Sequence, residues 1–425
     1  MERKRRYRLC LAAALAINLL VLAFFVWNWI QDSIPDQIRV NVGQEVQMDY
    51  QLPVTATSRV EDCQAVRVNT QPLSENELTL DLSQPFSLQI NEAGSYEVAL
   101  KFMGMTLKNV SVDAVDETYV MPVGMPAGLY IHTKGVMVLG TGKVTDVNGT
   151  VSEPAKNIFK SGDYVLSING TSVRNTSQAL SLIQSCGGSE IVFDILRDER
   201  EMQLKTRPVE TSENVYKVGI WLRDDTQGIG TITYVDADQK FAALGHGITD
   251  VDTGLLIEIS HGMVYRSNIL SVVKGESGTP GELVGTIDYQ RNNRMGTIEF
   301  NTDCGIFGTV DQDFLAYDEK KAVPIAHRQD IKEGEAQILC AVDGDTEVYD
   351  IRIEKIDYDN NDNKNFIIRI TDDRLLERTN GILQGMSGSP ILQNGKLVGA
   401  VTHVLVNDPT TGYGIFIENM LDAAE

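Results

Sequence analysis

The sequence predicts a mainly β protein with several domains behind an N-terminal transmembrane helix. Runs such as residues 38–42 and 96–102 alternate apolar and polar side chains, which is typical of half-buried strands. From about residue 215 to the C-terminus, short apolar runs are separated by glycine-rich turns, which indicates further strands. Because the chain has 425 residues, it is too long for one ordinary core, and we expect more than one domain.

The first 30 residues predict a membrane anchor. Five Lys and Arg side chains lie within residues 1–8, and residues 9–30 carry no charge. About 20 apolar residues cross a bilayer as a helix, and basic flanks stay in the cytoplasm. A cleaved signal peptide is the alternative, but its apolar region is shorter and ends in small residues, whereas this one ends in Trp27, Trp29 and Ile30. We therefore predict a retained single-pass anchor with a cytoplasmic N-terminus and the rest of the chain extracytoplasmic; release by later proteolysis stays open.

The segment that follows, residues 31–118, predicts a small β-rich domain. Four of its runs alternate with period two, and turn residues separate them. We expect a small β-sandwich. No residue pattern in it indicates chemistry, so a spacer or docking role is the default interpretation.

Residues 119–210 resemble a PDZ domain of the circularly shifted kind found in bacterial proteases. A Pro/Gly cluster at 122–126 marks the boundary, and the run Gly-Asp-x-x-Leu-x-Ile-Asn-Gly at 162–170 carries the resemblance, with a helix expected over about 176–184. Such domains add a peptide strand to a sheet edge and capture its carboxylate with backbone N–H groups. The resemblance implies that the peptide-binding loop consists of Gly128, Leu129, Tyr130 and Ile131.

Residues 211–425 contain the chemistry-bearing motifs. The run Gly-Met-Ser-Gly-Ser-Pro at 385–390 places Ser387 between glycines that allow a sharp turn, and strands are expected on both sides. The N–H groups of Gly385 and Ser387 can point into an oxyanion hole. Ser389, directly before a proline, is expected to be a turn hydroxyl. A two-barrel fold of the chymotrypsin type fits the length and the many short strands.

An activated serine needs a base and a group that orients the base. His246 ends the small-residue apolar run 241–245, which resembles the strand-to-turn segment that carries the histidine of chymotrypsin-like proteases. The sequence has five histidines. The other four lie in less suitable segments: His132 in the PDZ-like region, His261 on a polar stretch, His327 without turn chemistry, and His403 where a wall of the substrate pocket is expected.

The residues themselves do not decide which carboxylate orients His246. Asp372 and Asp373 follow the strand-like run 366–370, and adjacent strand residues face opposite sides, so at most one of them can face the histidine. Asp250, four residues after His246, is the local alternative.

The motifs at 244–250, 385–390 and 401–414, together with the order of anchor, β segment, PDZ domain and peptidase, closely resemble the stage IV sporulation protein B family of signalling serine peptidases in endospore-forming bacteria. The resemblance implies a catalytic triad of His246, Asp372 and Ser387. It also implies that the enzyme cleaves itself and then a membrane-bound regulator in the space between the two membranes around the forespore. That cleavage would release an intramembrane protease, which activates a late sigma factor.

Composition excludes some alternatives. The formal net charge of −22 argues against a nucleic-acid partner, because a protein that binds the phosphate backbone needs a basic face.

We expect no cofactor and no metal: the loop from Asp357 begins like a calcium loop but has Asp362 at the sixth position and Ile368 at the twelfth. A bridge between Cys304 and Cys340 is allowed by an exported location, and the sequence leaves it open.

Overall fold

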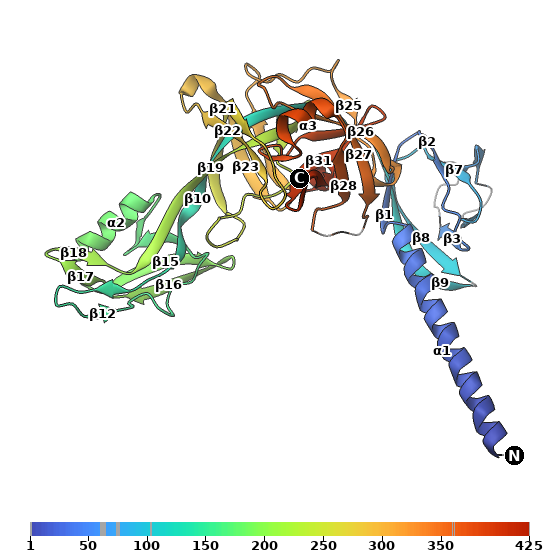
Figure 1. Cartoon of the computed structure of the whole chain (residues 1–425), viewed down its shortest axis with the longest axis horizontal. Helices are drawn as coiled ribbons and strands as arrows, with labels where there is room; N and C mark the ends of the chain where they lie inside the picture. Colours follow the sequence, from blue (N-terminus) through green and yellow to red (C-terminus); the bar gives the residue numbers. More distant parts are fainter. Residues whose placement is uncertain are drawn as a thin grey trace. The chain divides into compact units, whose positions relative to one another are not determined.

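The computed structural model describes residues 2–59, 65–73, 77–102, 104–358, 360 and 362–424, and the chain divides into two compact units. One unit contains residues 1–118 with the short segments 324–332 and 356–361. The other contains residues 119–323, 333–355 and 362–425. Figure 1 shows the elements of each unit. The fold is mainly β, as the sequence predicts.

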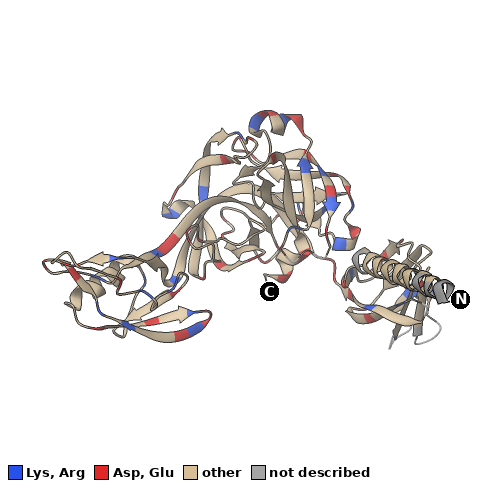
Figure 2. Cartoon of the chain, turned by 60° about the horizontal axis from the view of Figure 1, so that its bottom comes forward, with Lys and Arg blue, Asp and Glu red and all other residues tan. Residues whose placement is uncertain are grey.

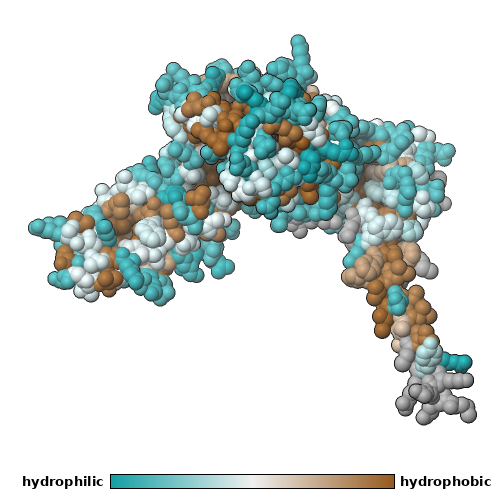
Figure 3. Space-filling view, in the orientation of Figure 1, coloured by the Kyte–Doolittle hydropathy of each residue, from teal (hydrophilic) through white to brown (hydrophobic). Residues whose placement is uncertain are grey.

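The first unit is a β-sandwich that packs against the end of a long helix. The helix α1 spans Glu2–Ser33, and its Leu11–Ile30 segment, with a mean hydropathy of 2.1, is long and apolar enough to cross a membrane. Figure 3 shows the apolar side chains along this helix. One sheet has the strand order β1-β9-β8-β3-β6 and the other β2-β7-β4-β5. The strands are β1 (Gln37–Asn41), β2 (Glu45–Met48), β3 (Thr55–Arg59), β4 (Val66–Val68), β5 (Gln71–Pro72), β6 (Glu77–Asp81), β7 (Phe86–Ile90), β8 (Gly94–Phe102) and β9 (Met105–Val115).

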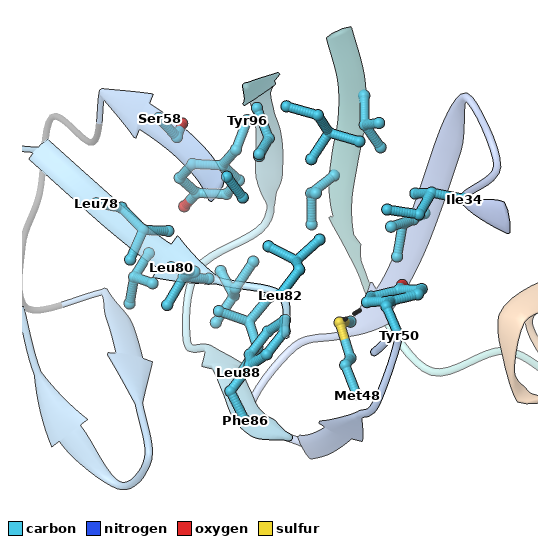
Figure 4. Close-up of a pocket in the computed structure, with 18 residues that line it drawn as sticks. Ile34, Met48, Tyr50, Ser58, Leu78, Leu80, Leu82, Phe86, Leu88 and Tyr96 are labelled. Atoms are coloured by element: carbon cyan, nitrogen blue, oxygen red, sulfur yellow. Dashed lines mark hydrogen bonds between the residues drawn. The ribbon is translucent and has the colours of Figure 1, made fainter. Parts of the chain in front are cut away.

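The core of the sandwich includes the end of the helix. Ile30 and Ile34 are buried among the apolar side chains of the sheets. The same core leaves a small cavity of about 60 Å³, lined mainly by apolar side chains such as Leu80, Leu88 and Tyr96 (Figure 4). A cavity of this size has room for only one or two waters, so we interpret it as a packing gap.

The second unit contains two closed β-barrels. In the first barrel, strand pairings close a ring in the order β10-β19-β20-β24-β23-β21 and back to β10. In the second barrel, the ring is β26-β27-β28-β32-β31-β30. The double barrel predicted from the sequence is thus confirmed. The strands of the first are β10 (Tyr119–Thr141), β19 (Ile220–Val235), β20 (Lys240–Ala243), β21 (Ile259–Val273), β23 (Arg294–Thr302) and β24 (Gly305–Val310); those of the second are β26 (Gly334–Cys340), β27 (Glu347–Ile356), β28 (Phe366–Ile370), β30 (Pro390–Gln393), β31 (Lys396–Leu405) and β32 (Asp408–Phe416).

The PDZ-like region is an extension of the first barrel. The strands β10 and β19 continue past the barrel and join a sheet of order β16-β15-β13-β10-β19, and helix α2 packs on its core through Ala179 and Ile183. Asn175 caps α2 by accepting a hydrogen bond from the Gln178 N–H. The elements are β11 (Val144–Thr145), β12 (Val151–Ser152), β13 (Tyr164–Ile168), β14 (Thr171–Ser172), α2 (Thr176–Ser185), β15 (Ile191–Arg197), β16 (Arg200–Thr206), β17 (Val209–Ser212) and β18 (Val215–Lys217).

Short elements complete the second unit and connect its parts. They are β22 (Gly281–Ile287), η1 (Arg291–Asn293), β25 (Val323–Pro324), η2 (Arg328–Asp330), α3 (Asp373–Thr379), β29 (Leu383–Gln384) and α4 (Ile417–Asp422), of which η2 belongs to the first unit. Figure 2 shows acidic and basic residues scattered singly over the ribbon of the barrels, most of which consists of other residues.

Candidate active site

The turn that carries Ser387 depends on two glycines with left-handed backbone. Gly385 has a φ of 100° and Gly388 a φ of 95°, which residues with a side chain rarely adopt. A Cβ on Gly388 would lie 2.1 Å from the carbonyl oxygen of Thr231. The second glycine therefore lets the turn of the second barrel approach strand β19 of the first.

Two threonines of β19 fix this turn. The Thr231 N–H donates to the Ser387 carbonyl over 3.0 Å, and the Thr231 hydroxyl donates to the Gly385 carbonyl over 2.8 Å. The Thr233 hydroxyl, which is buried, donates to the Gly388 carbonyl over 2.8 Å. Because the three carbonyls point at β19, the peptide planes of the turn are set by the first barrel.

Strand β31 holds the turn from the other side. The Gly388 N–H donates to the Val401 carbonyl over 2.7 Å, and the Val401 N–H donates to the Ser389 carbonyl over 2.9 Å. The Ser387 Oγ donates to the Thr402 carbonyl over 2.6 Å. In the described part of the chain the Ser387 N–H donates to no acceptor, so it is available for an oxyanion, as the sequence predicts for this group.

His246 follows β20 through a sharp turn of the chain. Leu244 and Gly245 both have positive φ, of 72° and 68°. A Cβ on Gly245 would lie 3.0 Å from a methyl carbon of Thr402, so this turn packs directly against the strand that holds Ser387. Beyond it, the Asn301 side chain accepts a hydrogen bond from the Ile248 N–H and donates to the Ile248 carbonyl, which fixes the loop after the histidine.

The imidazole of His246 is held in one tautomer by its neighbour. Its Nδ1 lies 2.9 Å from the Gly247 carbonyl oxygen. Since a carbonyl can only accept, Nδ1 carries the proton and Nε2 keeps its lone pair, which is the form a general base requires. Burial lowers the pKa of His246 below its ordinary value of 6.5, so the ring is neutral at pH 7.

His403 lies against His246. The two ring centroids are 4.8 Å apart, with an angle of 37° between the ring planes. The β31–β32 register shifts between Val401 and His403, so a bulge at Thr402 separates the carbonyl that binds Ser387 from the ring that contacts His246. Burial, then the charges of His246 and Lys364, lower the pKa of His403 to about 4.

The structure brings the Ser387 and His246 segments together and does not bring Asp372 to them. Asp372 is the N-cap of α3, where its carboxylate accepts hydrogen bonds from the Arg374 backbone and guanidinium and from the Asp350 N–H. The pKa of Asp372 is lowered chiefly by Arg374. In the described structure helix capping and Arg374 use this carboxylate and no contact with His246 is seen, so Asp372 as the triad acid stays a prediction from the family resemblance.

Neither rival carboxylate contacts His246. Asp250 is buried, and its carboxylate pairs with Arg223 and accepts from the Thr253 N–H. Asp373 is the exposed first residue of α3. Among the interactions of the described residues, His246 has none with a carboxylate.

The expected peptide-binding loop, Gly128, Leu129, Tyr130 and Ile131, lies inside the first barrel. Each of these residues pairs with β19 on one side, as Gly128 with Ile229, and with β21 on the other, as Gly128 with Tyr265. The predicted loop is corrected, because its backbone is already used by two neighbouring strands. Its Tyr130 hydroxyl donates to Asp225.

A free strand edge lies elsewhere in the PDZ-like sheet. Between Ile220 and Asp225, β19 pairs with β10 on one side, and in the described chain no strand pairs with its other side. Helix α2 flanks β19 there, and the Thr176 hydroxyl donates to Asp224 over 2.8 Å. The strand is preceded by Gly219, with a φ of 76°. In the sequence this edge corresponds to the run Gly-Ile-Trp-Leu at 219–222, which the sequence analysis assigns to the strands of the peptidase barrel.

The remaining sequence expectations concern metals and cysteines. Within the described residues no group of three or more His, Cys, Asp or Glu side chains could hold a metal ion. Cys304 and Cys340 are both free thiols, and Cys340 is buried in the second barrel. Cys63 lies outside the described residues.

Comparison with known proteins agrees with a peptidase joined to a PDZ domain. Residues 214–421 match the family described as SpoIVB peptidase S55, and residues 153–197 match a PDZ domain. The family resemblance seen in the motifs is thereby confirmed, and the chain is a serine peptidase that carries a PDZ domain. No curated protein matches the sequence.

Comparison with solved structures finds two proteases at low identity and low TM-score. The chain is 14% identical to the Rv3671c protease from M. tuberculosis in its active form, with a TM-score of 0.22 over 46% of this chain and 72% of that one. It is 10% identical to the HtrA-type protease AlgW with decapeptide, with a TM-score of 0.29 over 72% of this chain and 64% of that one.

Proposed function

We propose that the protein is a membrane-anchored serine endopeptidase in which Ser387 is the nucleophile and His246 the general base. The observation that carries this proposal is the clamped turn: β19 and β31 hold Ser387 against the segment that presents His246. Acyl transfer needs this pair and an oxyanion donor, for which the Ser387 N–H is available.

The resting serine requires one local movement. Its Oγ is bonded to the Thr402 carbonyl, and rotation about the Cα–Cβ bond releases it toward His246. Nε2 of His246 then takes the hydroxyl proton as Oγ attacks the scissile carbonyl carbon. The same nitrogen returns the proton to the leaving amine, and the acyl-enzyme is hydrolysed by water.

The free edge of β19 is the proposed peptide site of the PDZ domain. A strand added between Ile220 and Asp225 would find backbone groups without a strand partner, with α2 as the second wall. We place the PDZ core at about residues 136–222, where one apolar cluster gathers its strands and α2. The substrate is a peptide or protein, and the domain presents or restrains it.

The finer function follows from the family resemblance. The N-terminus is cytoplasmic, the peptidase lies between the two membranes around the forespore, and the enzyme cleaves itself and then a membrane-bound regulator. This step starts intramembrane processing of a late sigma factor. The domain limits expected from the sequence, 31–118, 119–210 and 211–425, stay predictions, and the PDZ core proposed above moves the last boundary past residue 222.

A direct test is N-terminal sequencing of the products formed by the wild-type protein and by Ser387→Ala side by side. The proposal expects discrete new N-termini from the wild type and none from the variant. Products from purified Ser387→Ala protein would overturn it. Degradation of many unfolded proteins by the wild type would instead favour a general quality-control protease.

A further inference from the structure

We propose that Arg223 and Tyr164, two residues of the PDZ-like sheet, position the catalytic base His246 by holding the loop that follows it. The inference rests on the proposed function, because it concerns the same base. This loop consists of residues 247–258 and is called the base loop below. The PDZ-like sheet is thereby part of the support of the peptidase site, in addition to offering an edge to a peptide.

The base loop is a short hairpin that begins directly after the histidine. Its two arms pair with each other at Thr249 and Leu256. The first arm carries the Gly247 carbonyl, whose oxygen lies 2.9 Å from Nδ1 of His246 and fixes the tautomer of the ring. A displacement of the hairpin therefore moves the group that holds the imidazole.

A buried carboxylate closes the tip of the base loop, and Arg223 of β19 is its cation. The Asp250 carboxylate accepts from the Asp252 N–H over 3.1 Å and from the Thr253 N–H over 2.9 Å, and it is shielded from solvent. A buried charge is costly unless an opposite charge pairs with it. Arg223 pairs with Asp250 through Nη1, and its Nη2 lies 2.7 Å from the Asp252 carboxylate. One guanidinium therefore clamps two carboxylates of the base loop.

Tyr164 holds the other arm of the base loop. Its hydroxyl accepts a hydrogen bond from the Glu258 N–H over 2.9 Å, and the Glu258 carbonyl accepts from the Lys134 N–H over 2.9 Å. Two residues before Tyr164, a Cβ on Gly162 would lie 2.4 Å from a methyl carbon of Leu255. The Gly-Asp motif that carries the PDZ resemblance thus contacts the base loop with the glycine, and the tyrosine after it makes a second contact.

Arg223 and Tyr164 lie in one row of the PDZ-like sheet. Each of them pairs with Met137 on β10, the strand between β19 and β13. Residues paired across neighbouring strands point to the same face of a sheet. Asp224, the next residue along β19, contacts α2 instead. The base loop is therefore held on the face away from α2, by a residue that also belongs to the free edge of β19.

The test is labelling of Ser387 by a fluorophosphonate in the full-length protein, over a range of reagent concentrations that separates the maximal rate from reagent binding. Arg223→Met keeps an apolar stem and removes both ion pairs. It should lower the maximal rate about 100-fold, because a base misplaced by about 1 Å loses that much, and leave reagent affinity within about twofold of the wild type. Amide hydrogen exchange of residues 247–258 should become faster in the same variant.

Three further variants separate positioning from loss of the fold. Arg223→Lys restores a cation and should recover the maximal rate to within about tenfold of the wild type. Tyr164→Phe keeps the ring and removes one hydrogen bond, so we expect a loss of about fivefold. Lys156→Met breaks an exposed ion pair with Glu153 elsewhere in the PDZ domain and should label at the wild-type rate. Thermal unfolding of each variant reports whether the fold is intact.

Several outcomes would overturn the inference. A folded Arg223→Met variant with the wild-type maximal rate would show that the clamp does not position His246. A slow variant with unchanged exchange at 247–258 would show that the effect bypasses the base loop, and an equal loss in Lys156→Met would show that any broken ion pair suffices. If Arg223→Met unfolds because Asp250 is left unpaired, Tyr164→Phe decides, since a wild-type rate there contradicts the inference.

Failure of the proposed function gives a different result. A wild-type protein that is not labelled at Ser387 would overturn the assignment of the nucleophile, whereas hydrogen exchange of the base loop still reports whether Arg223 holds it.

Discussion

The two halves of the candidate site are held in different ways. The turn with Ser387 is bound through its backbone by β19 on one side and β31 on the other. The loop with His246 depends on side chains: Asn301 fixes the loop, and His403 covers the ring. The comparison teaches that the nucleophile is placed by several hydrogen bonds to its own backbone, from main-chain groups and from two threonine hydroxyls, whereas the base depends on fewer contacts, most of them from single side chains.

The largest effect is expected at the nucleophile itself. Ser387→Ala should lower the rate of peptide cleavage by about 10⁶-fold, because it removes the attacking group. Ser389→Ala is the matched control in the same turn. In the described structure the buried Ser389 hydroxyl has no hydrogen-bond partner, which corrects its expected role as a turn hydroxyl. This variant should keep wild-type cleavage and equal or greater thermal stability. Equal losses in both variants would contradict the assignment.

The next largest effect tests the backbone clamp. Gly388→Ala forces a Cβ to within 2.1 Å of the Thr231 carbonyl at a φ of 95°. We expect a loss of about 100-fold or more in labelling of Ser387 and a clear drop in the unfolding temperature.

Gly395→Ala is the control for backbone strain alone. Gly395 has a φ of 77°, but no atom lies within 4 Å of the Cβ position. It should cost about 1–2 kcal/mol in the free energy of unfolding and leave labelling near the wild-type rate. If the two glycine variants behave alike, the clamp is not what places the serine.

A further effect on stability is expected at Asp372. Asp372→Ala removes the N-cap of α3 and a partner of Arg374, and it should lower the free energy of unfolding by about 1–2 kcal/mol. Labelling of Ser387 tests whether Asp372 is also the triad acid, because loss of that acid costs about 10⁴-fold. Asp373→Ala, at an exposed neighbour, is the control.

The stability effect of Asp372 should depend on pH. The pKa of its carboxyl is lowered in the folded protein. The stabilisation that this carboxylate gives to the folded protein is therefore fully present above its pKa in the unfolded chain, about 3.9. It is lost as the pH falls through the lower pKa of the folded state. Denaturant unfolding should show a gap between wild type and Asp372→Ala at pH 7 that closes in acid. A gap that grows in acid would contradict the assigned ion pair.

The smallest effect on catalysis is expected in the PDZ groove. A peptide that binds the domain should shift the backbone amide resonances of residues 220–225 and leave those of residues 128–131 unchanged. The first segment has a free edge, and the second is paired on both sides. Shifts confined to 128–131 would restore the loop expected from the sequence.

The sequence predicted what depends on local chemistry. Strand alternation, the glycine turn around Ser387 and the small-residue strand before His246 each carry their own signal, and the double barrel follows from them. The surroundings of His246 could not be predicted this way. Asp372 has a family motif but is bonded to Arg374, and His403 meets His246 only through the pairing of distant strands. The free edge of β19 could not be predicted, because β10 and β19 each run from the first barrel into the PDZ-like sheet, and the sequence gives no sign of this double use.

The central claim is that His246 activates Ser387, and mass-spectrometric mapping of a fluorophosphonate adduct tests it most directly. We predict a single adduct on Ser387, formed faster as the pH rises through a midpoint below 6.5 because burial lowers the pKa of His246. His246→Gln should abolish this pH dependence and nearly all labelling. An adduct on another residue, or undiminished labelling in His246→Gln, would contradict the account.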